Sequence, residues 1–240
     1  MIKIENTEVV GWEAAIRGMR NPKNSWDRMD SFVCFDGDTV CHDTCTFKGK
    51  CPFYDKDDHF IVGPNDHKLM MSLAAGGPVH AKYRRMITVY VDITAPLYWW
   101  KEFDTYKVGT VANSCSTMHK IHDKEFELSD FSYEHLSDFS LQIVLEKTIE
   151  ALNHYRNEYL KNRNKFDWWQ MIQLLPSSYN QKRTIMLNYE VLAGIYPMRK
   201  NHKLDEWHDF CDWIKSLPYS EVIVGWDEAL SNKFDMPKEK

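Results

Sequence analysis

The order of apolar and polar residues predicts strands in the first half of the chain and helices in the second. Within the first 30 residues, a strand-like segment precedes apolar residues at helical spacing. Further on, four β-branched residues alternate with other residues: Ile87, Val89, Val91 and Ile93. This period of two predicts a strand that Pro96 ends. We expect a short helix to follow over 97–107.

The second half is predicted to be helical because its apolar residues recur every three or four positions. One helix carries the stripe Leu136, Ile143, Val144, Ala151, Leu152, Tyr155 and Tyr159. Further helices are predicted over 166–174, 180–198 and 203–216. Asp205 and Glu206 suit the start of the last one, where the helix dipole favours negative charge. In the first half, Asn65 is expected to cap a helix that stops at Gly76-Gly77.

Composition agrees with one globular domain of α+β or α/β class over residues 1–240. The chain is 43% hydrophobic and 27% charged, which excludes a disordered or collagen-like protein. A net charge of −5 argues against a broad nucleic-acid or membrane surface, but it leaves room for a local basic pocket. No apolar run approaches the ~20 residues of a membrane span. The N-terminus, MIKIENTEVV, lacks the apolar region of a signal peptide, so we expect a cytoplasmic protein.

Residues 31–58 differ from the rest of the chain and are predicted to be a loop or small insertion. They hold four cysteines with little periodicity: Cys34, Cys41, Cys45 and Cys51. Four thiolates in so short a segment suit a tetrahedral zinc ion, and less readily an iron–sulfur cluster. The spacing contains no CxxC pair, so a loop with free thiols is the alternative.

Familiar catalytic motifs are missing from the sequence: there is no GxGxxG, Walker loop, HExxH or GxSxG. Residues 108–120 are small and polar, which lets backbone N–H groups approach a ligand. The same composition is typical of turns. Cys115, within this segment, would be a nucleophile only if a neighbouring base lowered its pKa.

A longer segment, His80 to Thr110, resembles the flavin-dependent thymidylate synthases, the ThyX family. In that family a histidine opens the segment, a strand follows, and a helix ends in an Arg-His-Arg triplet and a serine. Without gaps, His80 falls on the histidine and Ala95-Pro96 on an Ala-Pro of some members. The triplet positions hold Thr105, Tyr106 and Lys107, and the serine position holds Thr110.

A second spacing carries the resemblance into the C-terminal half. The family has a Leu-Pro, an asparagine twelve residues after the proline, and an arginine eleven residues later. This chain has Leu175-Pro176, Asn188 and Arg199 at those distances. The arginine that precedes the Leu-Pro in the family is Ile172 here. Arg199 and Lys107 are therefore the remaining cations, and a lysine does not replace the bidentate fork of an arginine.

The resemblance implies an α+β, ThyX-like fold and a homotetramer. It implies reductive methylation of dUMP, or of a related pyrimidine nucleotide, with methylenetetrahydrofolate, FAD and NADPH. The implied flavin contacts are His80, Asn113 and Asn188. The implied nucleotide contacts are Lys107, Ser114, Ser116 and Arg199. The alternative is a non-catalytic relative that keeps the fold for nucleotide binding or assembly.

Taken singly, several of these residues have ordinary structural interpretations. His80 could be a surface or capping residue, and Lys107 a solvated lysine. Arg199 could face the C-terminal dipole of its helix. Asn188 lies inside a predicted helix, where asparagine is mildly unfavourable, and this hints at a partner. The pair Trp99-Trp100 is expected in the core or in a subunit interface.

Overall fold

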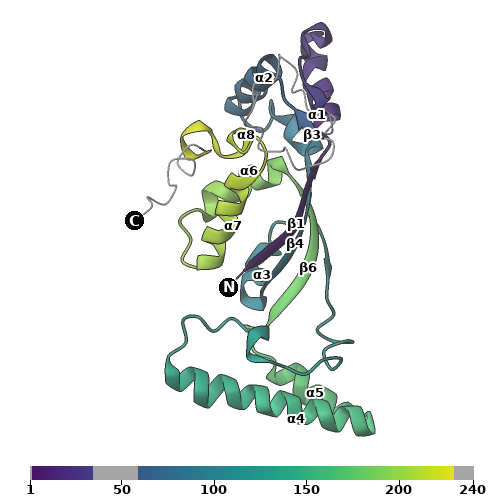
Figure 1. The fold of residues 1–240 in the computed structure, drawn as a ribbon, viewed down its shortest axis with the longest axis vertical. Helices are drawn as coiled ribbons and strands as arrows, with labels where there is room; N and C mark the ends of the chain where they lie inside the picture. Colours follow the sequence, from purple (N-terminus) through teal and green to yellow (C-terminus); the bar gives the residue numbers. More distant parts are fainter. Residues whose placement is uncertain (1, 35–58, 230–240) are drawn as a thin grey trace. The chain divides into compact units, whose positions relative to one another are not determined.

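The computed structural model describes residues 2–34 and 59–229. The chain forms two compact units, and each is built from separate stretches of sequence. Unit 1 comprises residues 1–8, 89–187 and 191–218; unit 2 comprises 9–88, 188–190 and 219–240. Strands and helices are both present, as the α+β prediction requires (Figure 1). Within the described ranges, none of the helices has the length and apolar character needed to cross a bilayer.

A four-stranded sheet forms the centre of unit 1. Its strands are β1 (Lys3–Val10), β4 (Thr88–Pro96), β6 (Asn180–Asn188) and β5 (Val111–Ser114), in that spatial order. β5 and β6 are antiparallel, with Asn113 opposite Thr184. The alternating residues Val89, Val91 and Ile93 of β4 are buried, which confirms the strand predicted there.

Helices rich in aromatic residues cover one face of this sheet (Figure 1). They are α3 (Leu97–Phe103), α6 (Tyr189–Arg199) and α7 (Asp205–Ser216). The Trp99 ring lies 4.8 Å from Trp207 and 5.6 Å from Phe210, measured between ring centroids. Trp100 is also buried, and its indole N–H donates to the carbonyl oxygen of Gln181 at 2.9 Å. The tryptophan pair therefore belongs to the core.

The remainder of unit 1 is a helical hairpin with its own apolar cluster. A π-helix (Ser140–Leu145) continues into α4 (Glu146–Asn162), and α5 (Lys165–Leu174) packs along it (Figure 1). A short 3-10 helix, Leu128–Asp130, precedes them. The buried residues of the cluster are Ile121, Phe126, Phe131, Leu145, Leu152 and Met171. The predicted helical stripe is right from position 140 onward, but its first residue, Leu136, lies outside the helix.

Unit 2 consists of short elements around α1 (Trp12–Arg20) and α2 (Pro64–Ala75). Two 3-10 helices (Asn21–Lys23 and Trp26–Arg28) follow α1, a third (Lys82–Met86) precedes β4, and α8 spans Glu221–Val224. The strands β2 (Phe32–Cys34) and β3 (His59–Ile61) pair in antiparallel fashion.

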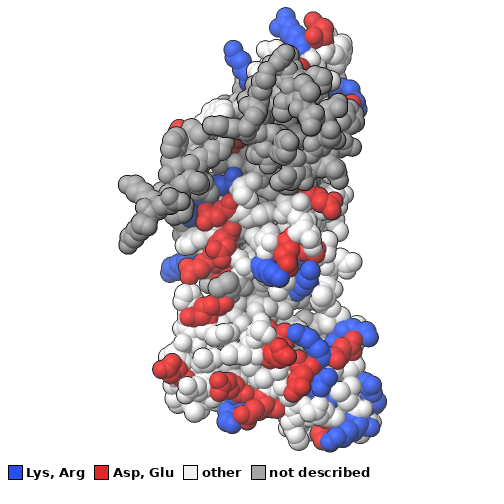
Figure 2. Space-filling view, in the orientation of Figure 1, with Lys and Arg blue, Asp and Glu red and all other residues white. Residues whose placement is uncertain are grey.

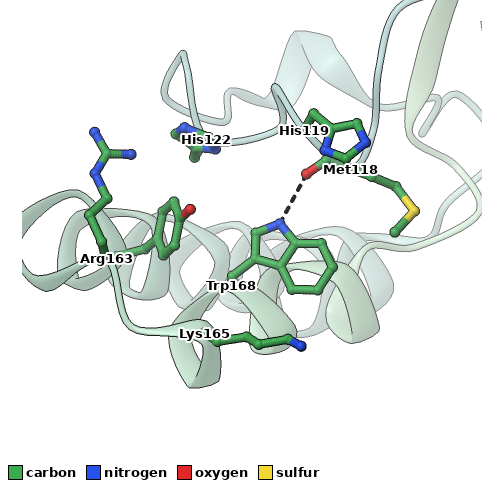
Figure 3. Close-up of a pocket in the computed structure, with 7 residues that line it drawn as sticks. Met118, His119, His122, Arg163, Lys165 and Trp168 are labelled. Carbon is green, nitrogen blue, oxygen red and sulfur yellow. Dashed lines mark hydrogen bonds between the residues drawn. The ribbon is translucent and has the colours of Figure 1, made fainter.

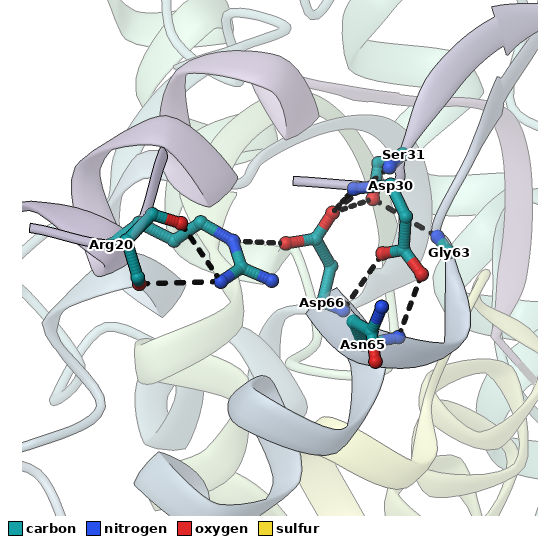
Figure 4. Close-up of polar contacts among 7 residues, drawn as sticks. Arg20, Asp30, Ser31, Gly63, Asn65 and Asp66 are labelled. Atoms are coloured by element: carbon teal, nitrogen blue, oxygen red, sulfur yellow. Dashed lines mark hydrogen bonds and ion pairs between the residues drawn. The ribbon is translucent and has the colours of Figure 1, made fainter. Parts of the chain in front are cut away.

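The start of α2 departs from the prediction that Asn65 caps it. Gly63 is the N-cap, and the side chain of Asp30 accepts the backbone N–H groups of Asn65 and Asp66 at 2.9 and 3.0 Å (Figure 4). A Cβ built on Gly63 would stand 2.3 Å from Asp30, so the close approach needs glycine. A capping group 33 or more positions away is invisible to local sequence rules, which consider only neighbours.

Two further predictions about regular structure are wrong. Residues 180–188 form β6, not the first part of a helix, and only 189–199 are helical. Part of the polar segment 108–120 forms β5 instead of an open loop. In both cases the pairing of β5 with β6 decides the conformation, because the backbone N–H and C=O groups of each strand form hydrogen bonds with those of the other. The helix predicted over 97–107 forms but ends at Phe103.

Candidate functional site

Arg199 is the predicted nucleotide ligand with the most elaborate surroundings. It is the last residue of α6, and its side chain is 16% exposed. Its Nη1 lies 2.6 Å from Oε2 of Glu102, and its Nε donates to the Tyr106 hydroxyl at 2.7 Å. The guanidinium stacks on Trp207, 4.5 Å from the ring centroid. These contacts hold the cation in one orientation while part of it faces solvent.

Glu102 is the centre of this cluster, and the sequence interpretation did not identify it. The same oxygen, Oε2, also accepts the indole N–H of Trp207 at 3.0 Å and lies 3.2 Å from Nε2 of His202. Nδ1 of His202 accepts the backbone N–H of Leu204 at 3.2 Å, so Nε2 carries the imidazole proton and donates to Glu102. Glu102 thus binds His202 and Trp207 as well as Arg199, and the positive charge of Arg199 already has this carboxylate as its partner.

The positions of the family triplet contribute unequally to this cluster. Tyr106 reaches Arg199 through its hydroxyl, whereas the hydroxyl of Thr105 donates to the backbone oxygen of Glu102 at 2.8 Å. Lys107 lies in the exposed loop after α3. Within the described part of the chain it has no ion-pair partner. Lys107 thus supplies a solvated charge close in sequence to the Arg199 cluster.

The predicted ligands on and after β5 differ in their availability. Asn113 and Ser114 are exposed on β5. The hydroxyl of Ser116 accepts the backbone N–H of His119 at 2.8 Å and of Met118 at 3.3 Å, so Ser116 makes a turn.

The two cysteines with described side chains differ in chemistry. Cys115 is exposed and free, whereas Cys211 is buried in α7. Burial raises the pKa of Cys211 to about 12, which keeps its thiol neutral.

His80 and Asn188, two of the predicted flavin contacts, belong to unit 2. His80 is exposed in a turn, and its ring packs over Gly76, where an added Cβ would stand 3.1 Å from it. Asn188 was predicted to lie within a helix, and this is wrong: it is the last residue of β6. Its side-chain oxygen accepts the backbone N–H of Glu190 at 3.1 Å and so starts α6. The amide thus combines a structural role with its predicted one.

A largely buried charged pair in unit 2 joins Arg84 to Glu190, two positions after Asn188. Nη1 of Arg84 is 3.7 Å from Oε2 of Glu190. Nε of Arg84 and Oε2 of Glu190 are buried without a hydrogen-bond partner in the described ranges. Arg84 lies in the 3-10 helix before β4. Unsatisfied buried groups of this kind are costly, and they mark a place where a polar ligand is favoured.

The predicted zinc ligands fall mostly outside the described residues. Cys34 ends β2, where its backbone is paired with that of His59. Cys41, Cys45 and Cys51 lie outside the described ranges. Among the residues that are described, no group of three or more His, Cys, Asp or Glu is placed to hold a metal ion. The zinc site therefore stays a prediction.

Comparison with solved structures shows which fold this is. The chain has a ThyX-like fold. It aligns with ThyX from Helicobacter pylori, solved with FAD and dUMP, at a TM-score of 0.59 and 15% identity, covering 95% of this chain and 99% of the other. A second structure of the same enzyme with FAD and dUMP gives a TM-score of 0.60 at 15% identity, with 94% and 98% covered. No protein-family model matches the chain, and no curated protein matches its sequence.

Proposed function

We propose that this chain binds a pyrimidine nucleotide and FAD, and that it carries out the reductive methylation of dUMP or of a related pyrimidine nucleotide. The observation that carries the proposal is Arg199. It falls at the position of the family arginine, and Trp207, Tyr106 and Glu102 hold it with part of its guanidinium open to solvent. The ThyX-like fold, aligned over nearly the whole chain with an enzyme solved with FAD and dUMP, supports it.

The nucleotide phosphate would be bound by Arg199 and Lys107. A phosphate monoester brings about two negative charges. Arg199 offers a bidentate fork, Lys107 adds an unpaired charge, and the exposed Ser114 adds a hydroxyl. Ser116 would contribute only if its turn opened, because its hydroxyl already accepts two backbone N–H groups. The Glu102 carboxylate competes with a phosphate for the Arg199 guanidinium. Phosphate binding therefore requires Glu102 to give up part of its contact with Arg199.

The flavin would be held by His80, Asn113 and Asn188. An asparagine amide offers a donor and an acceptor to a ring edge, and His80 and Asn113 are exposed. The buried Nε of Arg84, which has no hydrogen-bond partner in the described ranges, supplies a further donor beside the ion pair with Glu190. These residues fit a polar, anionic cofactor in the chemistry of their donors. NADPH would reduce FAD, the reduced flavin would supply the hydride, and methylenetetrahydrofolate would supply the carbon.

A second candidate, a non-catalytic nucleotide-binding or assembly protein, is favoured by one observation. Arg199, the cation proposed for the phosphate, is paired with Glu102, and two of the three triplet positions are the uncharged Thr105 and Tyr106. Electrostatic stabilisation of a transition state needs charge that is free to act on the substrate. This chain keeps less of it than the family pattern does.

Binding and turnover together separate the two candidates. Purified protein is reconstituted with excess FAD, and flavin absorbance is recorded before calorimetry with dUMP. We expect the parent protein to bind FAD, and we expect His80→Ala and Asn188→Ala to bind it more weakly. We expect the parent protein to bind dUMP, and we expect Arg199→Gln to bind it about tenfold or more weakly, because a charge-assisted contact is lost. The matched control is Arg17→Gln, which removes an exposed arginine of α1. Equal effects of the two arginine variants would refute the assignment of Arg199.

Product analysis then decides on catalysis. The protein is incubated with dUMP, methylenetetrahydrofolate, FAD and NADPH, and thymidylate is quantified. Formation of thymidylate supports the enzyme. Binding of dUMP without product supports the non-catalytic relative, and binding of neither ligand refutes the enzyme and leaves an assembly role as the better description.

The resemblance extends the proposal to the whole molecule. We propose that residues 1–240 form one ThyX-like domain with a Cys-rich insertion at about 31–58, that it assembles as a homotetramer, and that it acts in the cytoplasm. Light scattering on the eluted protein tests the assembly, and a monomer would refute it. Elemental analysis for about one zinc per chain tests the insertion.

A further inference from the structure

A pocket of about 280 Å³ opens where α4 ends and α5 begins, within unit 1 (Figure 3). None of the proposed nucleotide contacts lines it, and Ser116 touches it only from behind, through bonds from the backbone N–H groups of Met118 and His119. Its lining residues are Met118, His119, His122, Tyr159, Arg163, Lys165 and Trp168. The seven combine aromatic surface with cationic and imidazole nitrogen, and they include no carboxylate.

Aromatic side chains fix the walls of the pocket. The indole N–H of Trp168 donates to the backbone oxygen of Met118 at 2.9 Å, and this bond sets the orientation of the ring (Figure 3). Tyr159 meets the ring of His122 edge to face, with centroids 4.9 Å apart. A planar ring entering the pocket would therefore meet surfaces that are already in place.

Two cations at the α4–α5 turn lack carboxylate partners. Arg163 ends α4 in a left-handed conformation, with φ of 55°, and its guanidinium lies 5.3 Å from the Tyr159 ring centroid. Lys165 is the first residue of α5. In the described part of the chain, no carboxylate lies within ion-pair distance of either. By contrast, Lys147 and Lys161 of α4 each pair with a glutamate three positions away.

The imidazole of His122 has hydrogen-bonding capacity that the fold does not use. Its Nδ1 is buried without a partner in the described ranges, and its Nε2 is 3.5 Å from a carboxylate oxygen of Asp123. Asp123 is also held by Lys120 at 3.1 Å. A buried nitrogen without a partner costs the folded chain free energy, and core packing alone does not require a histidine here. Figure 2 shows Lys and Arg side chains gathered over this end of the hairpin.

We propose that this pocket binds a small organic phosphate that carries one planar ring. Two unpaired cations match the nearly two negative charges of a phosphate monoester. Trp168 and Tyr159 supply apolar surface for the ring. The volume lies below the roughly 300–1,000 Å³ of pockets for drug-sized ligands, which limits the occupant to a single ring and its phosphate.

The test uses phenyl phosphate as the probe with the full-length protein. Calorimetry gives the affinity, and NMR spectra of the histidine and tryptophan side chains locate the site. We expect binding that shifts the signals of His122 and Trp168. Inorganic phosphate should bind more weakly because it lacks the ring, and phenol should not bind because it lacks the charge.

Paired variants assign the binding to the turn. Arg163→Gln with Lys165→Gln should weaken phenyl phosphate binding about tenfold or more, because two charge-assisted contacts are lost. The control, Lys3→Gln with Lys147→Gln, removes two exposed charges elsewhere and should leave the affinity unchanged. All four substituted residues are exposed, so both variants are expected to fold, and circular dichroism checks this.

Three outcomes would overturn the proposal. The first is no binding of phenyl phosphate at its solubility limit. The second is equal affinity in the two paired variants. The third is loss of binding in Arg199→Gln, which would place the probe at the proposed nucleotide contacts instead. Because phenyl phosphate contains no pyrimidine, failure here leaves the proposed function untouched.

Discussion

Two arginine–carboxylate pairs of equal length play different parts in this molecule. Arg20 and Asp66 in unit 2, and Arg199 and Glu102 in unit 1, each approach to 2.6 Å. The side chains of the first pair are 4% and 0% exposed, and those of the second are 16% and 35% exposed. Distance alone does not distinguish them, but burial and the surrounding donors do.

Both oxygens of Asp66 and two of the three guanidinium nitrogens of Arg20 have hydrogen-bond partners (Figure 4). One oxygen of Asp66 accepts Nε of Arg20, and the other accepts the backbone N–H groups of Asp30 and Ser31 and the Ser31 hydroxyl. Arg20 also donates to Ser25. The pair fastens α1, the segment at 30–31 and the start of α2 together, and it is almost completely buried.

The Arg199–Glu102 pair concentrates its bonds on one oxygen. Oε2 of Glu102 takes the contacts of Arg199, Trp207 and His202, and both members are partly exposed. A partly exposed pair of this kind is held weakly, because solvent competes for both charges. The difference in exposure supports the proposal that Arg199 can exchange Glu102 for a phosphate, whereas the Arg20–Asp66 pair is buried.

The largest effect is expected from breaking the buried pair. Arg20→Met leaves the Asp66 carboxylate buried without its cation, and this should lower the free energy of unfolding by about 3–5 kcal/mol. Urea denaturation followed by fluorescence measures it. Arg17→Met in the same helix is the control; its partner Glu13 is exposed, so the change should stay within about 0.5 kcal/mol. Similar losses in the two variants would show that Arg20 has no special role.

A smaller effect, on binding instead of stability, is expected at the exposed pair. Glu102→Gln keeps the shape of the side chain but removes the charge that competes with phosphate for Arg199. Affinity for dUMP should rise about fivefold, which corresponds to about 1 kcal/mol. Calorimetry measures it, and Glu150→Gln, which breaks the exposed pair with Lys147, is the control. Unchanged or weaker binding by Glu102→Gln would contradict the idea that Glu102 restrains Arg199.

The smallest effect is expected only in acid. Burial raises the pKa of Asp66, but hydrogen bonds from Ser31 and Asp30 and the Arg20 guanidinium outweigh it, so the pKa lies below the usual 3.8. The unfolded chain therefore takes up this proton first. The carboxylate's stabilisation is complete above pH 3.8 and is lost as the pH falls through the folded pKa.

Acid denaturation of Asp66→Asn tests this sign. The amide cannot titrate, so the variant should lose stability less steeply below pH 3.8 than the parent does. Parallel loss of stability in the two proteins would show that the folded pKa of Asp66 is not lowered.

Local patterns predicted much of the fold. The alternation in β4 and the helical spacing in α1, α5 and α7 appear in the structure as predicted, because each pattern reports which face of one element is buried. The strands β5 and β6 were missed, since Asn180–Asn188 contains helix-forming residues and only its two neighbours in the sheet make it a strand.

The candidate site was only half predictable. Spacing alone pointed to Arg199, and Tyr106 was named only as a departure from the family triplet. Glu102 carries no signal in the sequence, because a glutamate in a short helix is ordinarily a solvated residue. The pocket at the α4–α5 turn likewise depends on Met118 and His119 approaching Trp168, some 50 positions later in the chain. No local rule reports such a contact.

The sequence by itself therefore determined the buried faces, the α+β class and the two spacings that resemble ThyX. The tertiary structure alone decided which charges are neutralised. Groups far apart in sequence, such as the side chains of Glu102 and Arg199, or the Asp30 carboxylate and the Asn65 backbone N–H, meet only after the chain has folded. Apolar periodicity is a property of neighbours and can be read along the chain, whereas the partner of a charge is set by the packing of distant segments.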